Sequence, residues 1–386
     1  MFHYDLLLKG GTLVDPAQGM HARRDVAFLG DRVAAVRKDI PREEARQVID
    51  ATGQIVTPGL IDVHVHIFDG VSHYGVPPDP TCLARGATTV VDAGSAGADT
   101  FRGFRKYIIE ASATRIYAQL NISSQGMLSR TIGELDDLKW ADVPKALQTI
   151  EQHRDVILGV KVRLTREQIV GKAAGLQPLY CAREAADAAG LPLMVHAQNS
   201  WASSLDEVLA VLRAGDVMTH MYHGREHGIL DEEGRIRPAV RAARERGVGF
   251  GVGHGEGSFS WRVAEAALEQ EFTPTTISSD LHVYNLHGPV FDLATTVSKF
   301  LYLGLSLDEA LSRVTAIPAR VIRQEGRLGT LAVGACGDAV VFDMPTGTVD
   351  LWDSDREVRQ GTQWLVPRVV VRAGQIYTRH EVEAVS

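Results

Sequence analysis

Eight short runs rich in β-branched and other apolar residues are the feature that most constrains the fold of this chain. Their spacing is fairly regular, and most of them are followed by a helical pattern. Strands that alternate with helices are typical of βα units around a parallel sheet, and eight such units close a barrel. The sequence therefore predicts an α/β fold, a (β/α)8 TIM barrel. The runs are residues 63–68, 88–93, 116–122, 157–164, 192–197, 217–222, 248–253 and 275–281.

Helices are expected between these runs. Apolar residues recur at helical spacing over 261–272 and 293–305. Ser204 with Glu207, and Ser306 with Glu309, have the spacing of capping boxes at helix starts.

The two ends of the chain have a different sequence pattern, in which short β-type runs are separated by Gly-Gly and Gly-Asp turns. Sheets with open edges tend to find partners. The sequence therefore predicts that the ends pair into one small composite β domain, residues 1–57 with 327–386, beside a barrel of residues 58–326.

Composition narrows the class of protein. The chain has 386 residues, of which 45% are hydrophobic, enough for a large core. A net charge of −8 provides no cationic field for nucleic acid or an anionic membrane, so a small-molecule partner is expected, and homo-oligomerisation stays open. The N-terminus has no basic region of a leader, and no run approaches the length of a membrane span.

The cysteines indicate a reducing compartment. Cys82, Cys181 and Cys336 are odd in number, far apart and outside any C-x-x-C pattern. Neither a disulfide framework nor a thiolate zinc site is therefore expected. A cytoplasmic location suits this cysteine usage.

Two histidines in the first run suggest metal binding. Residues i and i+2 of a strand share a face, so His64 and His66 project together, and Asp62 could face the same side. Alone, a His-x-His pattern is weak. Ligand-type residues near the ends of other runs strengthen it, because the chemistry of such barrels sits at the C-terminal strand ends. These residues are Lys161, His196, His220 and Asp280.

The stretch Pro-Gly-Leu-Ile-Asp-x-His-x-His at residues 58–66 resembles the metal-binding signature of the amidohydrolase superfamily, which includes dihydroorotase, hydantoinase, urease and N-acyl-amino-acid deacylases. The resemblance covers essentially the full chain and is closest to the deacetylase branch near dihydroorotase. It is most specific at residues 89–97, 219–224, 253–261 and 277–282.

The resemblance implies two divalent ions of the zinc class. His64, His66 and Asp280 would hold one ion, and His196 and His220 the other. Lys161, carboxylated by CO2, would bridge them, whereas Lys172 lies in a polar, loop-like context. A bridging hydroxide would attack the carbonyl, one ion would polarise that carbonyl, and Asp280 would carry the proton to the leaving group.

Substrate contacts are less constrained. Arg163 should share the face of Lys161 and could bind a substrate carboxylate, or it could pair with a protein carboxylate. Each of four further residues near strand ends is a candidate substrate contact or a hydrogen-bond partner of a ligand: Tyr222, His223, His254 and His282.

The function that these residues favour is hydrolysis of an acyl amide or ester, such as the acetyl group of an N-acetyl-α-amino acid or an O-acetyl-α-hydroxy acid. Ligands do not distinguish amide from ester. Phe68 stands where dihydroorotase has a carboxylate-binding arginine, which disfavours cyclic amides as in dihydroorotase or hydantoinase. Ala93-Gly94 stands where the D-aminoacylase type has a cysteine ligand, so that metal arrangement is not expected.

The ligand set also bears on two further classes of protein. A catalytically silent scaffold would have lost ligands, and this chain retains all six. A deaminase of the superfamily usually has one metal and lacks the lysine, so Lys161 speaks against it.

Overall fold

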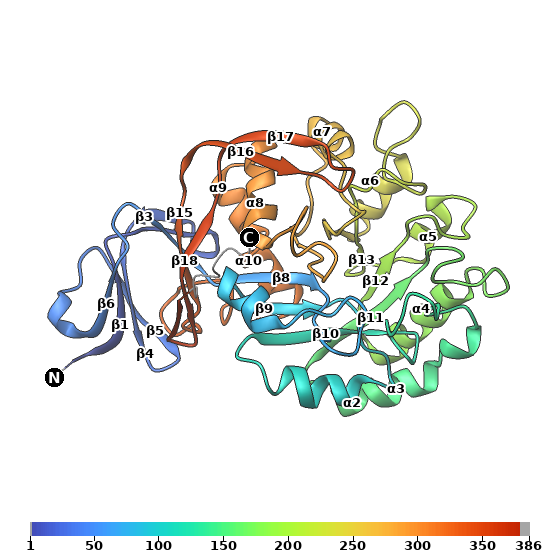
Figure 1. The fold of residues 1–386 in the computed structure, drawn as a ribbon, viewed down its shortest axis with the longest axis horizontal. Helices are drawn as coiled ribbons and strands as arrows, with labels where there is room; N and C mark the ends of the chain where they lie inside the picture. Colours follow the sequence, from blue (N-terminus) through green and yellow to red (C-terminus); the bar gives the residue numbers. More distant parts are fainter. Residues whose placement is uncertain (1, 379–386) are drawn as a thin grey trace.

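A curved parallel sheet forms the centre of the protein in this computed structural model, which describes residues 2–378. The sheet has seven strands in the order β14-β13-β12-β11-β10-β9-β8, and every neighbouring pair is parallel (Figure 1). All residues of β8 are buried, as expected for a strand covered on both faces. The strands are β8 Leu60–Val65, β9 Ala87–Asp92, β10 Arg115–Asn121, β11 Ile157–Arg163, β12 Leu193–His196, β13 Val217–Met218 and β14 Gly249–Phe250.

The eighth predicted run closes the sheet without forming a regular strand. Isolated parallel bridges join Gly251 to Thr276 on one side and Val65 to Leu281 on the other. The backbone leaves the extended region at Asp280, where φ is +50°, and this interrupts a continuous ladder. The predicted barrel is confirmed, with its last segment paired at single points.

Helices flank the outer side of the sheet, where α4 packs on β11 and β12 (Figure 1). The predicted stretches 261–272 and 293–305 contain α7 and α8. The capping box of Ser306 and Glu309 is present. The one at Ser204 is not, because Ser203 bonds the Glu207 carboxylate instead. The helices are α1 Pro78–Thr81, α2 Phe101–Phe104, α3 Val143–Gln152, α4 Gln177–Ala189, α5 Leu205–Val211, α6 Pro238–Glu245, α7 Trp261–Glu269, α8 Leu293–Tyr302, α9 Leu307–Ser312 and α10 Ala316–Val321.

The chain ends meet in one sheet, as predicted. A six-stranded sheet has the order β19-β18-β15-β7-β2-β3, in which β7 pairs with β2 in parallel and with β15 in antiparallel fashion. A four-stranded sheet, β5-β4-β1-β6, belongs to the N-terminal segment alone. The domain boundaries at 57/58 and 326/327 stay a prediction. The strands are β1 Tyr4–Lys9, β2 Thr12–Asp15, β3 Met20–Arg23, β4 Asp25–Leu29, β5 Arg32–Arg37, β6 Ala45–Asp50, β7 Ile55–Pro58, β15 Ala339–Asp343, β18 Val366–Arg372 and β19 Gln375–Thr378.

A hairpin of the C-terminal segment contacts helices of the barrel. The hairpin of β16 (Thr346–Trp352) and β17 (Val358–Gln363) runs across α8 toward α7 (Figure 1). The indole of Trp261, at the start of α7, donates to the carbonyl of Glu357 at 3.1 Å. This hairpin therefore lies against the helices that follow the last two barrel segments. Among residues 2–378, no helix is long and apolar enough to cross a membrane.

Candidate metal centre

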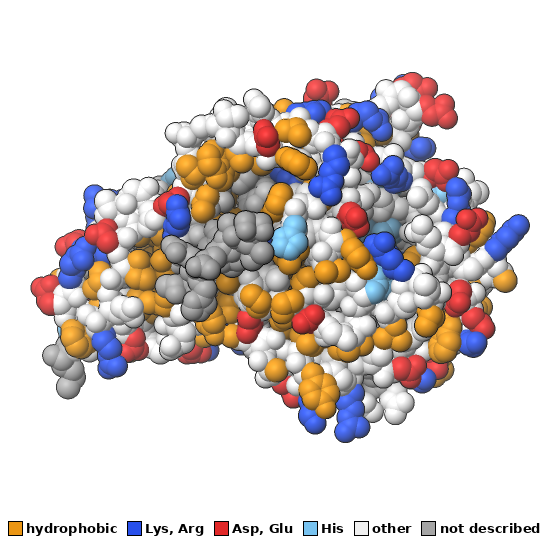
Figure 2. Space-filling view, viewed as in Figure 1, with side chains coloured by type: hydrophobic (Ala, Val, Ile, Leu, Met, Phe, Trp, Pro, Cys, Tyr) orange, Lys and Arg blue, Asp and Glu red, His pale blue; other side chains and the backbone are white. Residues whose placement is uncertain are grey.

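A cavity of about 230 Å³ opens at the C-terminal ends of the barrel strands. On the face shown in Figure 2, histidine side chains reach the surface over the barrel part of the molecule. All six predicted ligands line the cavity: His64, His66, Lys161, His196, His220 and Asp280. The barrel thus brings together residues from distant parts of the sequence, because parallel strands end at the same edge.

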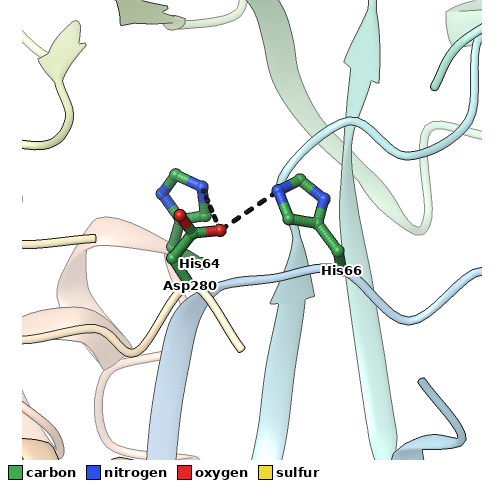
Figure 3. A group of neighbouring side chains, drawn as sticks. All are labelled: His64, His66 and Asp280. Carbon is green, nitrogen blue, oxygen red and sulfur yellow. Dashed lines mark ion pairs between the residues drawn. The ribbon is translucent and has the colours of Figure 1, made fainter. Parts of the chain in front are cut away.

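His64, His66 and Asp280 form a compact group (Figure 3). Oδ1 of Asp280 lies 3.2 Å from Nε2 of His66 and 3.4 Å from Nε2 of His64. Nε2 of His64 and Oδ1 of Asp280 are buried and have no hydrogen-bond partner within residues 2–378. Buried polar atoms are costly without a partner. Two such atoms that converge, with an imidazole beside them, fit a bound cation.

The ring orientations expose the nitrogens that a metal needs. Nδ1 of His64 contacts the hydroxyl of Thr219, and Nδ1 of His66 contacts that of Ser95, both at 2.9 Å. Nδ1 of His220 lies 2.7 Å from the carbonyl oxygen of Gly253. Because a carbonyl oxygen only accepts, His220 carries its proton on Nδ1, and Nε2 keeps a free lone pair.

Burial keeps these histidines neutral. It lowers the pKa of His66 and of His220 to about 3. Metal ligation requires the neutral imidazole, so the histidines are in the ligand-ready form at neutral pH without any proton release.

The second predicted group adjoins the first. The rings of His196 and His220 lie 4.4 Å apart between centroids, and Nε2 of His196 contacts Thr165 Oγ1 at 3.2 Å. Lys161 is buried, and burial lowers its pKa to about 7. A Cβ added at Gly94, where φ is +91°, would lie 2.8 Å from Cβ and Cγ of Lys161. Glycine at 94 therefore leaves room for the lysine stem.

Two of the predicted ligands have strained backbones. His220 has φ +62° and Asp280 has φ +50°, a left-handed conformation that costs a non-glycine residue about 1–3 kcal/mol. Local hydrogen bonds hold this geometry at Asp280, whose amide donates to the carbonyl of His64 at 2.7 Å and whose carbonyl accepts from Asn285 at 2.8 Å. Such strain gathers at functional sites.

Arg163 pairs with a protein carboxylate and also lines the cavity. Its guanidinium donates to Oε1 of Glu134 at 2.7 Å and to the hydroxyl of Tyr74 at 3.3 Å, and it also lines the cavity. Glu134 is buried and accepts a second bond from Asn121. The Glu134 carboxylate thus fixes Arg163 at the cavity wall, while the guanidinium retains donors for a ligand.

Of the other predicted substrate contacts, the cavity includes His282 and excludes Tyr222, His223 and His254. The Tyr222 hydroxyl donates to the carbonyl of Phe272, and Nε2 of His254 bonds Lys299. Tyr222 lies outside the cavity that His220 lines, because β13 ends at Met218 and the left-handed backbone at His220 breaks the alternation of a strand.

Sequence reasoning missed several residues of the cavity wall. Tyr74 lies in the loop after β8, with no pattern that marks it. Glu256, Gly257 and Ser258 lie in the stretch 253–261, which the resemblance already marked as specific, although none of them was predicted as a cavity residue by itself. The lining residues that were not predicted individually are Tyr74, Thr165, Gln168, Gln198, Asn199, Arg225, Glu256, Gly257 and Ser258.

Comparisons with known proteins agree with the geometry. The profile described as the amidohydrolase family matches residues 55–376. A deacetylase of Agrobacterium fabrum is 38% identical over 352 residues, covering 90% of this chain and 85% of its own. A deacetylase of Enterococcus faecalis is 34% identical over 377 residues, covering 97% and 99%.

Solved structures share the whole architecture. The crystal structure of a dihydroorotase superposes with a TM-score of 0.88 at 35% identity, covering 97% of both chains. That of an adenine deaminase has a TM-score of 0.88 at 33% identity and covers 97% of this chain and 100% of the other.

Proposed function

Because the chain belongs to the amidohydrolase family, we propose that this hydrolase removes the acetyl group from a small α-substituted carboxylic acid. The substrates in view are an N-acetyl-α-amino acid or an O-acetyl-α-hydroxy acid. The observation that carries the proposal is the cavity that six ligand-type side chains line together with Arg163. Relatives named deacetylases match nearly the whole chain, which supports this reaction class.

Ring-opening of a cyclic amide is the second candidate, because a dihydroorotase shares the fold closely. Phe68 argues against it. This side chain is buried and packs on Phe104, with ring centroids 4.9 Å apart. Position 68 therefore contributes to the hydrophobic core and offers no charged group to a substrate carboxylate.

The donor set suits two divalent ions of the zinc class, since imidazole and carboxylate are their usual ligands. His64, His66 and Asp280 would hold one, and His196 and His220 the other. Bound ions of this class polarise a carbonyl and lower the pKa of water. The family is generally metal-dependent, so this requirement is expected here.

Lys161 is proposed to join the two ligand groups as a carbamate. A pKa of about 7 leaves much of the buried amine neutral at physiological pH. The nitrogen lone pair can then form an N–C bond to CO2, while one C=O bond becomes C–O⁻ and the nitrogen proton leaves to solvent. The carbamate is an anion, whereas the protonated lysine is a cation. An anionic group between two metal cations reduces their mutual repulsion.

The other side chains then have defined tasks. Asp280 is buried beside His64 and His66, and there it would accept the proton of the attacking water and return it to the departing nitrogen or oxygen. Arg163 would hold the substrate carboxylate through its remaining N–H groups. Glu134 keeps the guanidinium oriented for this contact.

The test is metal content per chain, measured on protein purified with zinc and bicarbonate, together with hydrolysis of acetylated amino and hydroxy acids of both hands. We expect about two ions in the wild type and fewer in Lys161→Ala. Lys172→Ala is the matched control, because Lys172 is exposed, and it should retain both ions. One ion or none, unaffected by Lys161→Ala, would overturn the proposed site.

A further inference from the structure

Lys299 is a completely buried lysine in α8. Its Nζ donates to Nε2 of His254 at 2.7 Å and to the carbonyls of Pro289 at 2.8 Å and Trp352 at 2.6 Å. An ammonium group has three N–H donors, so each one has an acceptor. Burial lowers the pKa of Lys299, and the three acceptors favour its charged ammonium form. Lysines are almost never fully buried unless they are paired.

The bond from Lys299 determines the state of His254. Because Nε2 accepts from the lysine, the ring proton is on Nδ1, which donates to the carbonyl of Gly255 at 2.9 Å. The ring also stacks on Phe259, with centroids 4.5 Å apart and planes at 13°. Both the tautomer and the orientation of His254 are therefore fixed from outside the cavity.

His254 belongs to residues 253–258, here called the tethered loop. The carbonyl of Gly253 accepts from Nδ1 of His220 at 2.7 Å. Gly255 approaches Asp280 so closely that an added Cβ would lie 2.5 Å from Oδ2. The backbone on either side of His254 thus contacts two of the predicted metal ligands, and a shift of this loop would displace both.

A second bond set ties the same loop to the C-terminal hairpin. Oγ of Ser354, in the connection between β16 and β17, accepts from the amides of Ser258 and Phe259, each at 3.1 Å. Trp352, which accepts from Lys299, lies two residues earlier. The hairpin connection therefore holds the tethered loop at its far end, while Lys299 holds it at His254.

We propose that Lys299 is a positioning residue of the hydrolytic site: it fixes the tethered loop between the barrel and the C-terminal hairpin, and so maintains the geometry of His220 and Asp280. The inference rests on the proposed function, in which both residues are metal ligands. Lys299 does not line the cavity. It acts through His254.

The test replaces Lys299 by Met, which has a similar length and no donor. Amide hydrogen exchange is compared over 253–259 in the metal-free and zinc-loaded proteins. Exchange there should be faster by about tenfold, the factor for loss of a hydrogen bond. Displacement of reacting groups by about 1 Å costs about 100-fold, so kcat should fall by about that factor, with a smaller change in KM.

Leu301→Ala is the matched control. Leu301 is a buried core residue of the same helix, so its truncation lowers stability without removing the bonds of Lys299. Exchange over 253–259 should then change no more than in the rest of the barrel. Ser354→Ala, which removes the second bond set, replaces Lys299→Met if that variant does not fold, and it should shift exchange and kcat in the same direction.

Faster exchange confined to 253–259 together with the fall in kcat supports the proposal. Unchanged exchange over these residues, or a fall in kcat no larger than in Leu301→Ala at matched stability, overturns it. Failure of the proposed function is visible separately, as a wild-type enzyme that binds no zinc and hydrolyses no acetylated acid. The exchange comparison on metal-free protein then still decides whether Lys299 holds the loop.

Discussion

Oδ1 of Asp280 and Nε2 of His66 lie 3.2 Å apart at the mouth of the barrel, where Asp280 belongs to the last segment and His66 follows the first strand. A metal ion bound by both residues would connect the first strand of the barrel to its last segment. Metal bound to the folded state alone stabilises it, by about 2.7 kcal/mol when free metal is a hundredfold above Kd. Chelation should therefore lower Tm and abolish hydrolysis, and zinc should restore both.

Asp280→Asn tests whether this effect arises at the predicted site. The amide weakens the ligand set, so the rise in Tm with added zinc should shrink. A full zinc-dependent rise in Asp280→Asn would place the stabilising metal elsewhere.

Thr219 is expected to control metal affinity through His64. Its hydroxyl is 2.9 Å from Nδ1 of His64, and loss of such an orienting bond typically weakens metal binding about 10–100-fold. Thr219→Val should show this loss in a zinc titration with a chelating indicator. Thr219→Ser retains the hydroxyl and should bind zinc nearly as the wild type does. Equal affinities for the two variants would contradict the orienting role.

Arg163→Met is expected to raise KM for acetylated carboxylic acids by about tenfold or more, because a hydrogen bond between charged groups contributes about 1.5–3 kcal/mol. It should also destabilise the fold by about 3 kcal/mol or more, since Glu134 would remain buried without its partner. Steady-state kinetics and denaturant unfolding measure the two effects.

The double variant Arg163→Met with Glu134→Gln separates the effect on KM from the effect on stability. Removing the buried charge should recover much of the stability, while KM stays high. Recovery of KM along with stability would mean that Arg163 serves only the fold.

The metal-free protein is expected to lose stability in acid. Burial lowers the pKa of His223 and of His282 to about 3, from about 6.5 in the unfolded chain. Between these values the unfolded state binds more protons, so the free energy of unfolding is highest above pH 6.5 and falls as pH decreases toward 3. Tm measured from pH 7.5 to 4.5 tests this.

His223→Gln should reduce that slope, because one proton fewer is taken up on unfolding. The variant and the wild type should differ most in the change of Tm between pH 6.5 and pH 4.5. Identical slopes would exclude His223 as a contributor.

Much of the fold could be predicted from the chain because local periodicity reports directly on secondary structure. Seven of the eight runs overlap the parallel strands, and the paired ends form one sheet. The six ligand-type residues were predictable as well, since side chains at the C-terminal ends of barrel strands must converge. The eighth segment does not form a regular strand, because Asp280 adopts a positive φ. No sequence pattern predicts that conformation.

Only the tertiary structure decided what surrounds those ligands. The surrounding side chains come from loops and helices. Glu134 contacts Arg163, and Tyr74 lines the cavity. Lys299 and Ser354 hold the tethered loop. Their positions depend on packing between residues far apart in the chain, and such packing produces no periodic pattern in the sequence. The strand pattern by itself therefore determined a barrel with a metal-type ligand set at its mouth, and tertiary contacts determined how the set is held and which side chains a substrate meets.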